Sequence, residues 1–214
     1  VRKAGDRVRI TAQLIDVSDG AQIWSDSYDR DLTDIFAIQD EIAVAVVDKL
    51  RLTLLGEEAT RLRKRPAEDL GSYDAYLKGR FWIDRGASYF DRAKDSFDQA
   101  IRLSPRSALG YAGLASLYTY MGEAGADPRD VIPKAREAAR EALRIDGGLA
   151  EAHLAMARIR LYYDWNWSGA EAEYLQAIGS NPNYAAAYSG YSVNLYVLKR
   201  LNEALEKAKK GEEL

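Results

Sequence analysis

The sequence predicts a mainly α-helical protein, a superhelix of about four helical hairpins preceded by a small, incomplete α+β domain. A pattern of small, bulky and small residues recurs four times at helical spacing in the later part of the chain. Alternating apolar and polar residues near the start indicate strands. Aromatic residues are scarce before residue 71, where only 3 of the 22 lie. These observations predict two domains, 1–66 and 72–214, joined by a linker at 67–71.

The first domain is predicted to contain a strand hairpin and a long helix. Apolar and polar residues alternate over 7–16, and a second strand follows over 21–28 after the turn at Ser18–Gly20. Val1–Lys3 has the pattern of the end of a further strand. From Asp34 onward, apolar residues recur every three or four positions, which predicts an amphipathic helix. These few elements bury little apolar surface, so we expect further strands upstream in a longer protein.

The second domain is predicted from the repeated pattern, which marks the second helix of each hairpin. The pattern consists of Ala93, Phe97, Ala100 and Pro105; Ala135, Ala139, Ala142 and Gly147; Ala170, Tyr174, Ala177 and Pro182; and Ala204, Ala208 and Gly211. The repeats are expected at about 72–107, 108–149, 150–184 and 185–214. The residues at the end of the first three patterns, Pro105, Gly147 and Pro182, are 42 and then 35 positions apart. We therefore expect the second hairpin to have a longer inner loop, at 122–128.

Composition narrows the classes of partner. The 30 basic and 33 acidic side chains give a net charge of −3, without the basic excess of a dedicated nucleic-acid binder. Since the chain has no cysteine, disulfides and thiolate metal sites are excluded. The longest strongly apolar stretch, Ile42–Val47, is far shorter than the roughly 20 residues that cross a bilayer. We expect neither nucleic-acid binding nor a membrane span in this segment.

No arrangement of residues indicates catalysis. The sequence has no glycine-rich phosphate loop, no Ser-His-Asp set and no metal-spaced cluster of histidines or carboxylates. His153 is the single histidine, and beside apolar neighbours it is more readily a packing residue than a catalyst. Asp29, Asp31 and Asp34 precede a predicted helix, where carboxylates serve as caps. We therefore expect no enzyme, no cofactor and no metal.

Two further motifs have a simple structural interpretation. The Asp164–Ser168 segment holds Trp165 and Trp167 and could grip a cation or a sugar, but a helix cap at Asn166 or Ser168 with two packed indole rings explains it more simply. The basic run Arg61–Arg65 could contact phosphate, lipid head groups or a neighbouring domain. The charged end of a helix is the simpler explanation.

The sequence resembles two known families. The region 72–214 resembles four tetratricopeptide repeats, and Tyr163–Ala170 is similar to a Trp-Asp-Trp segment found in such repeats, with Asn166 in place of the usual Asp. The first 55 or so residues resemble the TolB-like amino-terminal domain. The segments that carry this second resemblance are VRITAQLID at 8–16, QIWS at 22–25, YDRDL at 28–32 and DIFAIQDEI at 34–42.

This pairing of domains is similar to the carboxy-terminal halves of bacterial adenylate cyclases and CadC-like transcriptional regulators. The resemblance implies a sensory or docking half whose cyclase or winged-helix output half lies elsewhere. It also implies a location in the bacterial cytoplasm or periplasm, depending on whether a membrane helix precedes the segment.

The resemblance implies a partner-binding groove on the inner face of each hairpin's first helix. In the predicted register this groove comprises Ala112, Ser116, Thr119, Tyr120, Leu154, Arg158, Leu161, Tyr162, Ser189, Val193 and Tyr196. Most of these residues are small, hydroxylated or apolar, and the Lys and Asn set that clamps a terminal carboxylate in some family members is absent. Tyrosines offer large contact area at low entropic cost, which suits an extended or helical peptide.

Three functions follow from this reading. The first is a non-catalytic interaction module of a bacterial signalling or regulatory protein, with a peptide or protein in the groove. The second is a small-molecule sensor that controls an absent cyclase or DNA-binding domain. The third is assembly of copies through the sheet edge or the uncapped end of the repeats. A deep pocket would favour the sensor, and an open groove would favour peptide docking.

Overall fold

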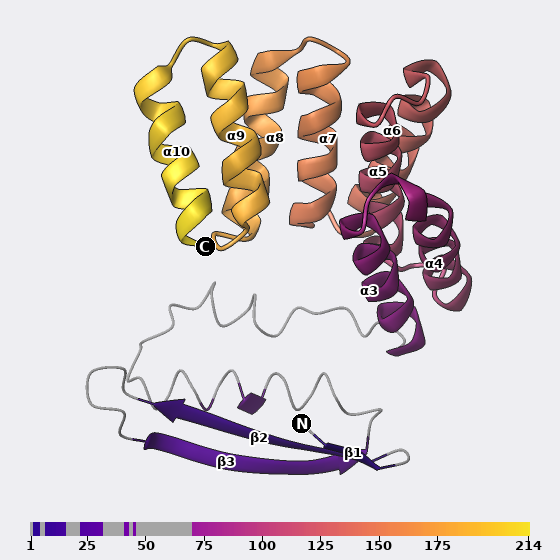
Figure 1. Cartoon of the computed structure of the whole chain (residues 1–214), viewed down its shortest axis with the longest axis vertical. Coiled ribbons are helices and arrows are strands. Elements are labelled where there is room, and N and C mark those ends of the chain that lie inside the picture. Colours follow the sequence, from indigo (N-terminus) through magenta and orange to yellow (C-terminus); the bar gives the residue numbers. More distant parts are fainter. Residues whose placement is uncertain (1, 5–6, 16–21, 32–40, 43–44, 46–69) are drawn as a thin grey trace. The chain divides into compact units, whose positions relative to one another are not determined.

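The structure is a computed structural model that describes residues 2–4, 7–15, 22–31, 41–42, 45 and 70–214. The chain divides into two compact units, Val1–Ala67 and Glu68–Leu214. Strands are described in the first unit and α-helical hairpins in the second (Figure 1). This arrangement confirms the predicted fold class, a mainly helical array preceded by a strand hairpin.

The first unit contains an antiparallel sheet in the order β1-β2-β3. The strands are β1 (Arg2–Ala4), β2 (Arg7–Ile15) and β3 (Gln22–Asp31). Because side chains alternate between the two faces of a strand, Val8 is buried while its neighbours Arg7 and Arg9 are exposed. Val8 and Tyr28 form a small core with Ile42, which belongs to a helical segment.

Several predicted features of this unit lie outside the described residues. They are the turn at 18–20, the basic run at 61–65 and most of the helix predicted from Asp34; only 41–42 and 45 of that helix are described, and they are helical.

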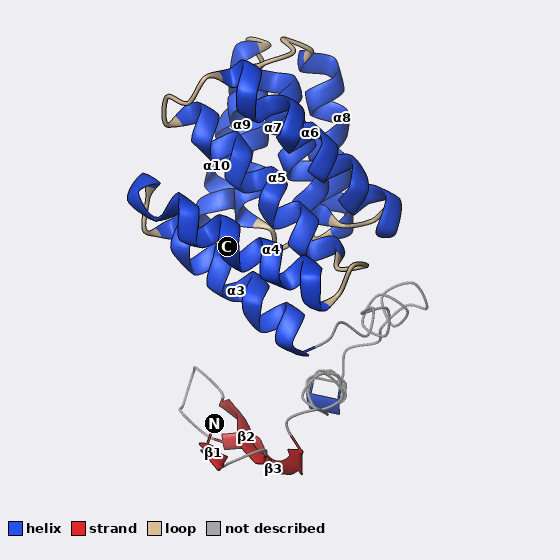
Figure 2. Cartoon of the chain, turned by 90° about the vertical axis from the view of Figure 1, so that its right-hand side faces the viewer, coloured by secondary structure: helices blue, strands red, loops and turns tan. Residues whose placement is uncertain are grey.

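The second unit is a series of antiparallel helix pairs. The pairs are α3 (Leu70–Asp84) with α4 (Phe90–Leu103), α5 (Ala108–Glu123) with α6 (Pro128–Ile145), α7 (Ala150–Tyr162) with α8 (Trp167–Ser180), and α9 (Ala185–Val197) with α10 (Leu201–Glu213). A short 3-10 helix, η2 (Ala87–Tyr89), precedes α4. Loops and turns connect these helices (Figure 2). None of the described helices is long and apolar enough to span a membrane.

The repeated small–bulky–small pattern explains how the hairpins stack. Its members in α4, α6 and α8 are fully buried. The Phe97 ring lies between Gly79 of its own hairpin and Gly113 of the next, and a methyl group on either glycine would overlap the ring. Tyr174 lies in the same way against Gly190. Large side chains on the second helices therefore fill space that glycines on the first helices leave open.

The prediction of a longer inner loop in the second hairpin is wrong. The loops at 124–127 and 163–166 have equal length in the second and third hairpins. The additional residues lengthen the helices instead, since α5 and α6 have 16 and 18 residues where α7 and α8 have 13 and 14. The alanine-rich sequence of α6 favours this outcome, because alanine has the highest helix propensity.

The Trp-rich turn before α8 agrees with the prediction in one respect and differs in another. Asn166 caps α8, since its Oδ1 accepts a hydrogen bond from the Gly169 N–H at 2.9 Å. The two indole rings are not packed as expected, because 73% of Trp165 and 37% of Trp167 is exposed. Trp165 also has a positive φ of 55°, a conformation that turns the chain sharply between α7 and α8.

Candidate functional site

The first helices of the hairpins lie beside one another and form a common surface. Contacts join α3 to α5, α5 to α7 and α7 to α9. We call the residues at matching positions of these helices the groove face. They are Tyr76, Arg80 and Asp84 of α3; Ala112, Ser116 and Tyr120 of α5; Leu154, Arg158 and Tyr162 of α7; and Ser189, Val193 and Val197 of α9.

A small pocket of about 60 Å³ lies in the groove face. Five of the residues predicted from the sequence line it together: Ala112, Ser116, Tyr120, Leu154 and Arg158. The pocket is thus formed jointly by α5 and α7, with residues of α3 and the start of α9 completing it.

The remaining predicted residues lie elsewhere. Thr119 is fully buried and its Oγ1 donates a hydrogen bond to the Ala115 carbonyl at 2.8 Å. Leu161 is buried in a core cluster with Tyr174. Ala112 and Leu154 are buried too, but they line the pocket and Thr119 and Leu161 do not. We therefore leave Thr119 and Leu161 out of the surface that a partner could touch. Tyr162, Ser189, Val193 and Tyr196 are exposed, so they remain accessible to a partner.

The pocket also contains residues that the sequence reasoning missed. They are Tyr76, Arg80, Ile83 and Asp84 of α3, with Glu151 and Tyr184. The repeat spacing points to Tyr76 and Arg80, since they stand 36 residues before Ala112 and Ser116. Lys78 obscured that register because it stands where a core leucine is expected; in the structure its ammonium pairs with Asp74 at 2.6 Å on the surface.

Arg158 is held rigidly at one side of the pocket. Its guanidinium carbon lies 4.2 Å from the centre of the Tyr120 ring. Its Nε donates a hydrogen bond to Glu123 Oε1 at 3.2 Å, and its Nη2 pairs with the other carboxylate oxygen. Only 19% of the side chain is exposed. Such a stacked and paired guanidinium loses little conformational freedom when a partner binds.

The other side of the pocket combines a cation, a carboxylate and two phenols. Arg80 Nη1 donates a hydrogen bond to the Tyr76 hydroxyl at 3.0 Å, and burial raises the pKa of Tyr76 to about 12. Burial also raises the pKa of the Glu151 carboxyl and of the Tyr184 phenol. These groups offer both donors and acceptors of hydrogen bonds in a partly desolvated place, where such bonds contribute more to recognition than in water.

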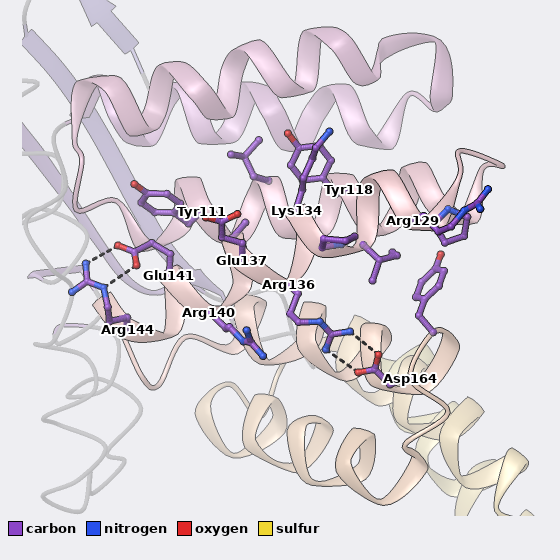
Figure 3. Close-up of a pocket in the computed structure, with 16 residues that line it drawn as sticks. Tyr111, Tyr118, Arg129, Lys134, Arg136, Glu137, Arg140, Glu141, Arg144 and Asp164 are labelled. Carbon is purple, nitrogen blue, oxygen red and sulfur yellow. Dashed lines mark hydrogen bonds and ion pairs between the residues drawn. The ribbon is translucent and has the colours of Figure 1, made fainter.

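A larger groove of about 1170 Å³ lies along α5 and α6 and includes Tyr163 and Asp164 of the turn before α8. Figure 3 shows its charged residues, several of which pair with one another. Arg136 donates two hydrogen bonds to Asp164, at 2.8 and 2.6 Å, and Arg144 donates two to Glu141, at 2.8 and 2.6 Å.

Within this outer groove, Arg140 has no carboxylate partner among the described residues. The sequence reasoning did not find the groove, because alternating Arg and Glu on one helix has the pattern of an ordinary solvated face.

His153 of α7 contacts both the turn before α7 and helix α8. Its Nδ1 lies 2.6 Å from Glu173 Oε2, and its Nε2 lies 3.0 Å from the Gly147 carbonyl oxygen. Glu173 also pairs with Arg160 at 2.9 Å. Both ring nitrogens face acceptors, so the hydrogen bond to Glu173, together with that to the carbonyl, raises the pKa of His153. The described residues contain no group of metal-binding side chains, and we interpret His153 as a structural link.

Comparison with known proteins places these features in context. No protein-family model matches the chain. A protein named "Putative adenylate cyclase 3", of Rhizobium meliloti (strain 1021), is 32% identical over 160 residues, which are 73% of this chain and 27% of that protein. The chain therefore spans about a quarter of the length of this curated relative.

Solved structures share the helical architecture. TTC0263, a thermophilic TPR protein of Thermus thermophilus, is 18% identical with a TM-score of 0.57, over 85% of this chain and 90% of that chain. PilW, a widely conserved type IV pilus biogenesis factor, is 18% identical with a TM-score of 0.53, over 67% of this chain and 61% of that chain. With the stacked hairpins described above, these likenesses show that the second unit has the helical-hairpin fold seen in tetratricopeptide repeat proteins.

Proposed function

We propose that the chain is a non-catalytic interaction module that binds an extended or helical segment of a partner protein along the groove face. The observation that carries this proposal is the pocket, into which side chains from the first helices of all four hairpins converge. Tetratricopeptide arrays present such surfaces to partner segments, and the fold therefore supports the same use here.

The size of the pocket favours a protein segment over a small molecule. Sites for small molecules enclose about 300–1,000 Å³, whereas this pocket holds about 60 Å³. It suits the tip of one side chain from a longer segment, so we prefer docking to small-molecule sensing.

The rest of the groove face supplies anchors of the kind that dominate protein interfaces. Arginine and tyrosine are enriched among the residues that contribute most binding energy, and Arg158 with Tyr120 forms such a pair beside the pocket. Beyond the pocket, Tyr162 and Val193 of the groove face are exposed, and 67% of Tyr196, which directly precedes Val197 of the groove face, is exposed as well. A segment seated with one side chain in the pocket could extend over these residues.

The wider setting that we propose is a bacterial signalling or regulatory protein in which a TolB-like region precedes the repeats. The similarity to part of an adenylate cyclase supports this setting. In it, the chain would serve as a docking half, and a separate region would carry the output activity.

A displayed library of random peptides tests the proposal. We expect the wild-type chain to enrich related sequences that an Arg158→Glu, Tyr196→Ala double variant does not retain. Arg140→Glu is the matched control, because it reverses a charge in the outer groove and leaves the groove face intact. Loss of the enriched peptides with Arg140→Glu alone would move the site to the outer groove. Failure to enrich any peptide would contradict the proposal.

A further inference from the structure

The outer groove is an elongated hollow in the middle of the array. It has a volume of about 1170 Å³ and is lined by α5, α6 and the turn before α8, so described hairpins precede and follow it in the chain. Its lining residues on α6 run from Pro128 to Arg144, a distance of about 24 Å at the rise of an α-helix. An extended segment of about seven residues has this length. The groove therefore has the dimensions of a site for a peptide segment.

The groove has a local surplus of positive charge. Its lining includes five basic residues, all on α6, and three acidic residues, although the whole chain has a net charge of −3. The other second helices show no such surplus. Three basic and three acidic residues lie on α4, two acidic and no basic residues on α8, and three basic and four acidic residues on α10. The charge of the groove therefore favours an acidic occupant.

One arginine in the middle of the groove is left without a carboxylate. Arg136, Arg140 and Arg144 recur every four residues and form a row along one face of α6 (Figure 3). The two outer members are neutralised, since each donates two hydrogen bonds to a carboxylate, that of Asp164 or that of Glu141. Arg140 is exposed and forms no ion pair with any described residue. Its guanidinium is therefore available to bind a carboxylate from another molecule with two parallel hydrogen bonds.

Two further charged groups lie on α6 beside Arg140. Lys134 forms no ion pair among the described residues either, and its ammonium lies 5.9 Å from the centre of the Tyr118 ring. Glu137 is exposed and is not paired with Arg140, one helical turn away. Because this one carboxylate offsets only one of the two unpaired cations, a positive charge remains for an occupant.

The surface beside the arginine row is largely aromatic and apolar. Tyr111 and Tyr118 of α5 and Tyr163 line the groove and are half-buried, and the buried Ile132 of α6 lines it as well. Tyrosine side chains give a large contact area at a low cost in conformational entropy. An occupant that suits both parts of the groove has an acidic residue with apolar residues on either side of it.

We infer that the outer groove binds an extended segment of a partner protein, in which an acidic side chain pairs with Arg140 and neighbouring apolar side chains pack on the tyrosines. A nucleic acid suits the groove less well, because its closely spaced phosphates need a longer run of unpaired cations than Arg140 and Lys134 supply. The outer groove is separate from the groove face. This inference therefore does not depend on the function proposed above.

Selection from three pools of seven-residue peptides tests the inference. Each pool has one fixed central residue, which is glutamate, glutamine or arginine, and random residues elsewhere. We expect the immobilised whole chain to retain peptides from the glutamate pool and far fewer from the glutamine pool. Individual glutamate peptides should bind Arg140→Gln at least about tenfold more weakly than the wild type, since a hydrogen bond between charged groups contributes strongly to affinity. Fluorescence polarisation measures this change.

Reversal of the charge separates the outer groove from other sites. Arg140→Glu should lose the glutamate peptides and retain peptides from the arginine pool instead. Arg102→Glu is the matched control, because Arg102 is also an exposed arginine of a second helix but lies on α4 outside the groove. The Arg158→Glu, Tyr196→Ala double variant alters the groove face and should still retain the glutamate peptides. Circular dichroism establishes that each variant is folded.

Four outcomes would overturn the inference. The first is equal retention of the glutamate and glutamine pools, or retention of neither. The second is loss of the glutamate peptides with Arg102→Glu as well as with Arg140→Glu, which would indicate a general effect of charge. Their loss with the groove-face double variant but not with Arg140→Glu would place them on the groove face. A short DNA duplex that binds the wild type more tightly than these peptides and displaces them would indicate a phosphate-binding surface instead.

Discussion

Asn194 offers the sharpest test of how the helical array is stabilised. It lies fully buried on α9, and neither its amide nitrogen nor its amide oxygen has a hydrogen-bond partner among the described residues. The matching positions of α5 and α7 hold Leu117 and Ile159, which are also fully buried. An apolar residue of similar size therefore suits this position in the neighbouring hairpins. We predict that Asn194→Leu stabilises the protein.

The magnitude follows from the two unpaired amide atoms. A buried polar group without a partner costs about 1–3 kcal/mol, and leucine avoids this cost with the same branched shape and the same number of non-hydrogen atoms. We expect the free energy of unfolding to increase by about 2 kcal/mol. For a chain of this size, that corresponds to an increase in Tm of about 4–8 °C.

Urea denaturation followed by circular dichroism measures this change, and the reciprocal Leu117→Asn variant serves as the matched comparison. Leu117→Asn should lower the free energy of unfolding by about 3 kcal/mol, because it adds a buried polar group and removes apolar contacts. An unchanged or lowered stability of Asn194→Leu would refute the reasoning. It would mean that the Asn194 amide is hydrogen-bonded in the folded protein, for example through an ordered water molecule.

Two further predictions concern glycines and the histidine. Gly113→Ala should lower the free energy of unfolding by about 1–3 kcal/mol, because the added methyl overlaps the Phe97 ring. Gly179→Ala should raise the free energy of unfolding by about 0.5 kcal/mol, because nothing lies within 4 Å of the new methyl. Urea titration measures both changes. The hydrogen bond to Glu173 raises the pKa of His153 in the folded chain. Protonated His153 should therefore contribute its full stabilisation of the folded state below the unfolded pKa of about 6.5. This contribution should disappear as the pH rises through the higher pKa of the folded state. Thermal melts across this range should show the loss in the wild type and not in His153→Gln; an equal pH dependence in both would contradict it.

The register of the hairpins could be predicted from the sequence because it depends on strict spacing. Small residues such as Ala93 and Ala170 are required wherever two helices approach closely, and a bulky residue four positions later fills the space between hairpins. Once the second helices are located, the inner face of the intervening helices follows from helical periodicity. For this reason the spacing places Ser116 and Arg158 on one surface, and both line the pocket.

Other features depend on information that spacing does not contain. The spacing from Pro105 to Gly147 gives the number of residues in the second repeat but not their conformation. Additional helical residues in α5 and α6 could therefore not be distinguished from a longer loop. The contribution of Arg80 to the pocket depends on how α3 lies beside α5 and α7, which bring together residues far apart in sequence. Trp165 is exposed and has a positive φ, a local backbone conformation that an indole side chain does not predict.

The affinity of a library-selected peptide for three forms of the chain tests the central claim most directly. Isothermal titration calorimetry would compare the wild type, Arg158→Ala and Arg140→Ala. Binding through the groove face predicts a loss of about 30-fold or more for Arg158→Ala, since truncating such an anchor costs about 2 kcal/mol or more, and no change for Arg140→Ala. Equal affinity of all three forms, or a loss confined to Arg140→Ala, would contradict the claim that the groove face binds the partner.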